Sequence, residues 1–143
     1  MKILKTYQEI QLFKTFEERF NYLKLDGKVG DETFGKDRYL NQKFYASEEW
    51  KEIRRFVITR DFGCDLGLLG YDIKGVPYIH HMNPITADDI INRTEILTNP
   101  DYLITVSLGT HNAIHYGDQN WIDFVNPVVL SVFQELNGSD MGN

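Results

Sequence analysis

All four histidines of this 143-residue chain lie between positions 80 and 115, as the pair His80-His81 and the pair His111 and His115. The second pair stands in THNAIHYG (110–117), whose composition predicts a helix. At i and i+4 the two imidazoles share one helix face, about 5–6 Å apart at Cβ. This spacing suits two ligands of one metal ion.

The first histidine pair follows GVPYI (75–79), an apolar run typical of a strand. Adjacent strand residues point to opposite faces, so His80 and His81 are not expected to hold the same ion. One of them can be a third ligand, and the other is then free to act on a water. A second strand, YLITVS (102–107), leads straight into the helix, which gives strand, long loop, strand and helix.

Three imidazole ligands without a nearby thiolate predict an open, catalytic metal site rather than a closed structural one. We expect one divalent ion, and Zn, Mn, Ni and Mg are the candidates, although imidazole favours the transition metals. Two other interpretations stay open. One is a non-catalytic, zinc-stabilised binding or assembly module in which Cys64 or His81 is a fourth ligand, and the other is an enzyme acting on RNA or another phosphodiester.

With these motifs the chain resembles the HNH endonucleases of the ββα-metal (His-Me finger) fold, and most closely the small phage-type HNH proteins. The matching segments are HHMNP (80–84), YLITVS (102–107) and THNAIH (110–115), with the approach Trp50-Lys-x-x-Arg54 and RDFGC (60–64). The resemblance covers residues 47–118. It implies hydrolysis of DNA phosphodiester bonds, by nicking or cleavage, in the processing of phage or prophage DNA.

The resemblance also implies a role for each histidine. His80 and His111 would be metal ligands, His81 the general base, and His115 a third ligand or a contact to the scissile phosphate. Asn112, beside His111, is a further candidate for the catalytic site. The chain departs from the family at Tyr102, which occupies the usual position of an asparagine that braces the loop carrying the base. The nearest polar residues are Asn99 and Asp101.

The composition predicts one domain without a secretory signal or membrane span. A single cysteine favours the cytoplasm, here that of a bacterial host. The net charge of −6 argues against non-specific duplex binding, which depends on basic side chains. We therefore expect weak intrinsic affinity for DNA, or recruitment by a packaging or other partner protein.

The fold class expected is α+β, a mostly helical single domain around the ββα-metal motif. We divide it into a helical leader (1–46) without a cap in residues 1–14, the nuclease core (47–118), and a C-terminal helix with a frayed tail (119–143). A helix at 47–58, capped by Ser47, buries Trp50, Ile53 and Val57. Its basic residues form a solvated face or contact phosphate: Lys51, Arg54 and Arg55. Cys64 is expected to pack as a small apolar residue.

Overall fold

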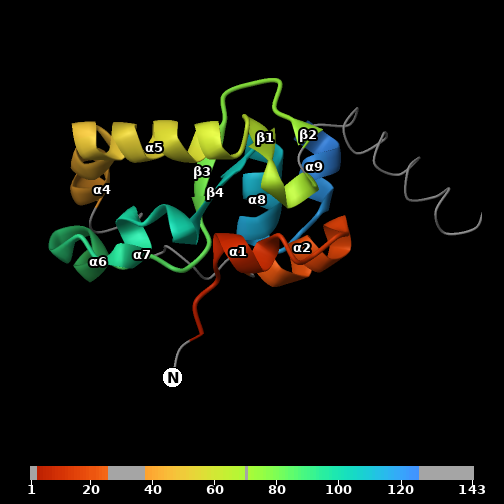
Figure 1. Ribbon diagram of the computed structural model, residues 1–143, viewed down its shortest axis with the longest axis horizontal. Coiled ribbons are helices and arrows are strands. Elements are labelled where there is room, and N and C mark those ends of the chain that lie inside the picture. The colour runs from red at the N-terminus through yellow and green to blue at the C-terminus, as the bar shows by residue number, and fades with distance from the viewer. Residues whose placement is uncertain (1–2, 26–37, 70, 126–143) are drawn as a thin grey trace, which may run out of the picture.

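The computed structural model describes residues 3–25, 38–69 and 71–125. This part of the chain combines helices with two small antiparallel sheets, so the α+β class is confirmed. The elements surround a central hairpin (Figure 1). The α-helices are α1 (Tyr7–Ile10), α2 (Phe16–Leu23), α4 (Arg38–Tyr45), α5 (Glu48–Arg60), α6 (Ala87–Asn92), α7 (Glu95–Thr98), α8 (Leu108–Tyr116) and α9 (Asn120–Val125). The strands are β1 (Cys64–Asp65), β2 (Tyr71–Asp72), β3 (Tyr78–His81) and β4 (Leu103–Val106), and the 3₁₀ turns are η1 (Leu66–Leu68) and η2 (Pro100–Tyr102).

Strands β3 and β4 pair antiparallel, and β4 leads directly into α8. The register places His80 opposite Ile104 and His81 opposite Leu103. Ser107 caps α8 by accepting a hydrogen bond from the Thr110 N–H, so the helix begins at Leu108, slightly before the segment 110–117 that the sequence predicts as helical. Gly117, with φ of 66°, ends the helix in the left-handed conformation that glycine adopts without steric cost.

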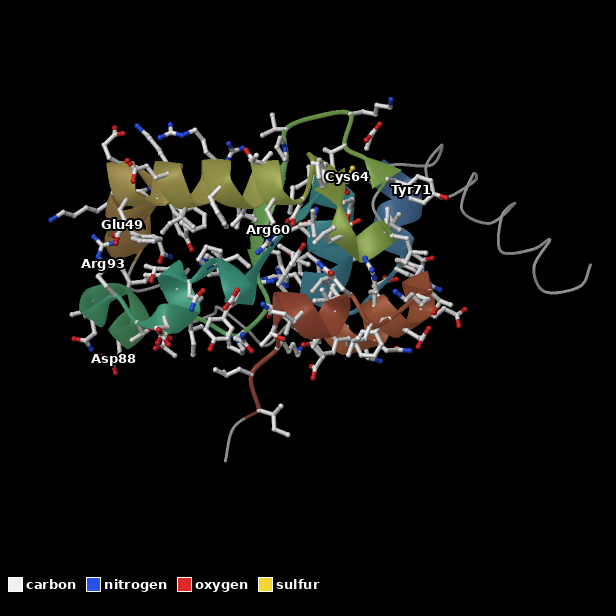
Figure 2. All side chains as sticks on the ribbon, viewed as in Figure 1. Glu49, Arg60, Cys64, Tyr71, Asp88 and Arg93 are labelled. Carbon is white, nitrogen blue, oxygen red and sulfur yellow. The ribbon has the colours of Figure 1, made fainter. Side chains whose placement is uncertain are left out.

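Helix α5 begins after Ser47, as predicted, because the Ser47 hydroxyl accepts the Trp50 N–H. Trp50 and Val57 are buried, and Ile53 packs beside them in the same cluster. The long loop between β3 and β4 folds into α6 and α7, and Thr86 caps α6 with Asp89 in a capping box. Arg93 after α6 pairs with Glu49 of α5 at 3.2 Å, and Figure 2 shows the two side chains facing each other.

The leader contributes directly to the core. Ile10 and Leu23 pack with Met82, Ile104 and Ile114 from the hairpin and α8. Thr15 caps α2, because its hydroxyl accepts the Glu18 N–H. The prediction that residues 1–14 lack a cap is wrong, because the Thr6 hydroxyl accepts the Glu9 N–H and begins α1.

The outer edge of β4 is not paired with another strand among the described residues. Instead, Asp61 accepts the Thr105 N–H at 2.9 Å and Asp65 accepts the Ser107 N–H at 3.1 Å. We call these two buried side chains the carboxyl clamp. Asp65 also accepts the Gly67 N–H and the Thr110 hydroxyl, and Arg60 pairs with Asp61.

Close packing fixes the position of η1 against α8. A Cβ added at Gly67 would lie 2.5 Å from the Thr110 side chain, so only glycine fits there. Arg60 holds the same side of the molecule by donating to the Pro100 and Leu103 carbonyl oxygens.

None of the helices within residues 3–25, 38–69 and 71–125 is long and apolar enough to cross a membrane. The predicted glycine-rich loop at 25–35 lies almost entirely outside the described residues, and so does the predicted C-terminal helix that starts at 127.

Candidate active site

A cavity of about 450 Å³ opens between the hairpin, α4, α5 and α8. The four histidines all reach it, which brings together the two pairs that are separated in the sequence. Its walls are formed by Leu25, Asn41, Tyr45, Trp50, Arg54, Val76, Pro77, Tyr78, Ile79, His80, His81, Asn83, Ile85, His111 and His115.

Three of the histidines form one cluster, as predicted from their spacing. The ring centroids of His80 and His111 lie 5.7 Å apart, and those of His111 and His115 lie 5.6 Å apart with nearly parallel rings. His111 and His115 come from one face of α8, and His80 faces them from β3. Tyr78 covers the other face of His111 at 5.9 Å.

The three histidines are of a residue type that binds metal ions, and their rings lie close together. An imidazole nitrogen lies about 2.0–2.1 Å from zinc, so two rings sharing one ion have centroids roughly 5–5.5 Å apart. The observed separations are slightly larger, and as the side chains stand no group of three His, Cys, Asp or Glu ligands in the described chain converges on one point. His80 Nε2 is nevertheless buried without a hydrogen-bond partner among the described residues, which is unusual for a polar atom unless it serves a ligand.

His81 occupies a different part of the cavity. Its ring stacks on Trp50 at 5.4 Å and an interplanar angle of 16°. Its Nε2 lies 3.2 Å from the Leu97 carbonyl oxygen. Because a carbonyl oxygen only accepts, Nε2 carries the hydrogen, and Nδ1 of the neutral ring is left as a proton acceptor.

Burial favours the neutral form of His80, His81 and His111. Desolvation lowers the pKa of His81 from its usual value of 6.5 to about 4. Desolvation also lowers the pKa of His80 well below its usual range, and the nearby His111 adds to that shift. The pKa of His111 is lowered by burial and by His115. Neutral imidazoles are the form that binds metal ions.

The bracing of the loop does not require an asparagine at position 102. The Tyr102 carbonyl oxygen accepts the Met82 N–H and extends the hairpin. The Asn99 side chain accepts the Asp101 N–H and caps η2. Asn99 therefore fixes the turn two residues after Leu97, whose carbonyl oxygen holds His81.

Asn112 does not line the cavity. Its side chain hydrogen-bonds to His111 and raises the pKa of that ring, against the larger effect of burial. Asn112 thus contacts one of the four histidines, and its place in the catalytic site stays a prediction.

Three basic residues of α5, which the sequence places on one face, differ in their positions. Arg54 lines the cavity and donates to the Pro77 carbonyl oxygen at 3.0 Å. Lys51 is exposed and pairs with Glu48 at 3.5 Å, and Arg55 is exposed away from the cavity lining. Lys51 and Arg55 therefore lie on the exposed face of α5, whereas Arg54 is the one of the three that lines the cavity.

Cys64 is absent from the cavity lining, so it is not placed as a fourth ligand. The expectation of apolar packing is also wrong, because its thiol is half-buried and lies 3.3 Å from the Asp72 carboxyl oxygen.

Two site residues escaped the sequence interpretation. Tyr45 lines the cavity from the end of α4, although its sequence context predicts ordinary packing. Asn83 also lines it, and its side chain exchanges two hydrogen bonds with the Lys5 backbone. The only signal for Asn83 was its position two residues after His81.

Comparisons with protein-family models, with curated proteins and with solved structures found no match to this chain.

Proposed function

We propose that this protein is a metal-dependent endonuclease of the HNH type that hydrolyses DNA phosphodiester bonds. The observation that carries the proposal is the division of the four histidines within one cavity. Three cluster at one place, and the fourth is held apart with a defined tautomer. A ligand set and a separate base are what metal-assisted hydrolysis requires.

The proposed ligands are His80, His111 and His115. A divalent ion bound there would supply a Lewis acid beside the scissile phosphate. Neutral imidazoles in a buried site favour zinc, manganese or nickel over magnesium, which prefers oxygen ligands. The buried, unpartnered Nε2 of His80 supports this assignment because coordination would satisfy it.

His81 is the proposed general base. Its Nδ1 accepts a proton from a water that attacks phosphorus, while the Leu97 carbonyl oxygen keeps the hydrogen on Nε2. The bond from phosphorus to the 3′ oxygen then breaks, and that oxygen takes a proton from solvent. Stacking on Trp50 limits rotation of the His81 ring during this exchange.

Arg54 is the proposed phosphate contact, since it is the one cation among the residues that line the cavity. The net charge of −6 disfavours extended binding along a duplex. Delivery to DNA by a partner, such as a component of a phage packaging machine, is consistent with this charge.

The decisive experiment compares His81→Ala with His111→Ala in a plasmid-nicking assay, after metal analysis of each purified protein. We expect His81→Ala to lower the cutting rate about 10²- to 10⁴-fold with metal content retained. His111→Ala should lose both metal and cutting. Asp88→Ala, at an exposed position on α6, is the control.

Loss of metal from His81→Ala would instead identify His81 as a ligand and favour a zinc-stabilised module without catalysis. Wild-type protein that cuts no DNA with zinc, manganese, nickel or magnesium would contradict the nuclease proposal.

A further inference from the structure

The cavity extends well beyond the histidine cluster. A phosphate with an ion occupies roughly the space of three to five waters, at about 30 Å³ each. The cavity of about 450 Å³ leaves most of its space to other groups. Apart from the histidines, the lining is mainly apolar and aromatic, with Tyr45, Trp50, Val76, Pro77, Ile79 and Ile85.

Tyr45 gives this wall a supported aromatic ring. Its ring packs edge-on against Trp50 at 5.0 Å and against Phe44 at 5.1 Å. The Tyr45 residue remains 38% exposed although it lines the cavity, and the His81 ring lies 6.2 Å away. Because Phe44 and Trp50 are themselves buried, the ring is fixed in place before any ligand arrives.

Polar groups accompany the aromatic wall. The Arg54 guanidinium lines the same space, and beyond its bond to the Pro77 carbonyl oxygen it has further N–H donors that can meet a nucleobase edge. Burial raises the pKa of Tyr45 to about 12, so its phenol stays neutral and able to donate.

The charges argue against a paired duplex in this cavity. Binding along a duplex backbone uses a series of cations, whereas Arg54 is the one cation in the lining. A base within a duplex is also covered on both faces by its neighbours and cannot enter a recess unless it leaves the stack.

We propose that the aromatic end of the cavity binds one unpaired nucleobase of DNA, next to the phosphate that is cut. The substrate is then single-stranded DNA, or DNA with an unpaired or extruded nucleotide. The location of the phosphate rests on the function proposed above, but the base-binding site does not depend on cleavage. Stacking contributes about 1–3 kcal/mol per base, which gives an acidic protein affinity that does not depend on many ion pairs.

The test measures binding by fluorescence anisotropy in EDTA, where no cutting occurs. The probes are a short labelled single strand, the same strand with one abasic position, and the matching duplex. Wild-type protein should bind the single strand more tightly than the duplex, and its affinity should fall only shallowly with salt. Tyr45→Ala should weaken single-strand binding roughly 5- to 150-fold, as expected for loss of one stacking contact.

Two variants control for folding and for aromatic content. Tyr45→Phe keeps the ring and should bind within about twofold of wild type, since every base can stack on either ring. Phe56→Ala removes an exposed aromatic of α5 that does not line the cavity, and it should bind like wild type. If Tyr45→Ala does not fold, crosslinking of a photoreactive base to Tyr45 in the wild-type protein replaces it.

Equal affinity for single strand and duplex, or unchanged binding by folded Tyr45→Ala, would overturn the base site. Absence of the Tyr45 crosslink in the replacement experiment would overturn it as well. A nicking assay separates the two proposals. Protein that binds single strands through Tyr45 but cuts nothing sustains the base site and contradicts the nuclease. If wild type and Tyr45→Ala cut duplex DNA equally well, the nuclease proposal is sustained and the base site is contradicted.

Discussion

Polar side chains are buried on two sides of β4, and the two groups differ in whether they have hydrogen-bond partners within the protein. At its outer edge, Asp61 and Asp65 of the carboxyl clamp accept backbone and hydroxyl hydrogen bonds from β4 and α8. Across β3, the histidine cavity contains His80, whose buried Nε2 has no partner among the described residues. The clamp carboxylates accept hydrogen bonds within the protein, whereas His80 Nε2 in the cavity can still accept or donate a bond to a ligand.

This difference separates the groups that maintain the fold from those available to a ligand. A satisfied buried network stabilises one arrangement of the chain, and an unsatisfied buried atom costs stability unless something binds it. We therefore expect substitutions in the clamp to affect unfolding, and substitutions among the histidines to affect binding.

The largest effect is expected for Asp65→Ala. The substitution leaves the buried Gly67 and Ser107 N–H groups and the Thr110 hydroxyl without their acceptor. Since each unsatisfied group costs about 1–3 kcal/mol, we expect a loss of roughly 3–5 kcal/mol in the free energy of unfolding. Urea denaturation measures it, with the exposed Asp88→Ala as control. A loss below about 1 kcal/mol would remove the distinction between clamp and cavity.

Metal binding should stabilise the folded protein through the histidines of the cavity and not through the carboxyl clamp. At a zinc concentration about 100 times its dissociation constant, the free energy of unfolding should rise by about 2.7 kcal/mol, because the ion binds only the folded chain. EDTA should reverse the gain. His111→Ala should show none of it, while Asp61→Asn should keep it from a lower starting stability. A zinc response of equal size in His111→Ala would contradict the ligand assignment.

Asn99→Ala tests whether the loop before β4 supports both the stability of the fold and the position of the His81 ring. Loss of the hydrogen bond from the Asp101 N–H should cost about 1 kcal/mol of stability. The nicking rate should fall as well, because Leu97 then holds His81 less firmly. Urea denaturation and nicking are measured on the same preparations, with the exposed Glu95→Ala for comparison. Lower stability with an unchanged rate would show that Asn99 serves only the fold.

His80→Leu should have the smallest effect on stability. Replacing an unpartnered buried imidazole with an apolar side chain of similar size is nearly neutral, so we expect a change within about 1 kcal/mol in EDTA. Zinc affinity should nevertheless fall by more than the roughly 10- to 100-fold that loss of a metal-supporting contact produces. A loss of stability like that of Asp65→Ala would make His80 a structural residue.

The local parts of this arrangement could be predicted from the sequence. Alternation along a strand places His80 and His81 on opposite faces, and an i, i+4 spacing pairs His111 with His115. The caps at Ser47 and Thr86 are equally local, because each depends on residues within three positions. These signals predict that one histidine of the first pair joins His111 and His115, but they do not say which one; only the family resemblance assigned His80.

The long-range parts could not be predicted. Asp61 and Asp65 bond to residues 44 and 42 positions away, and no periodicity marks such contacts. The partner of His81 is a backbone carbonyl oxygen of Leu97, which carries no side-chain signature. The low pKa of His81 follows from burial against Trp50, which depends on the packing of α5 on the hairpin.

The carboxyl clamp also occupies N–H groups at the outer edge of β4 that could otherwise pair with another strand. A two-stranded sheet usually presents free N–H groups that can recruit a foreign strand, and such recruitment is a common start of aggregation. Here two of the N–H groups of that edge, at Thr105 and Ser107, are already occupied by acidic side chains from the same molecule. These two contacts leave fewer free N–H groups at the β4 edge for a foreign strand to pair with.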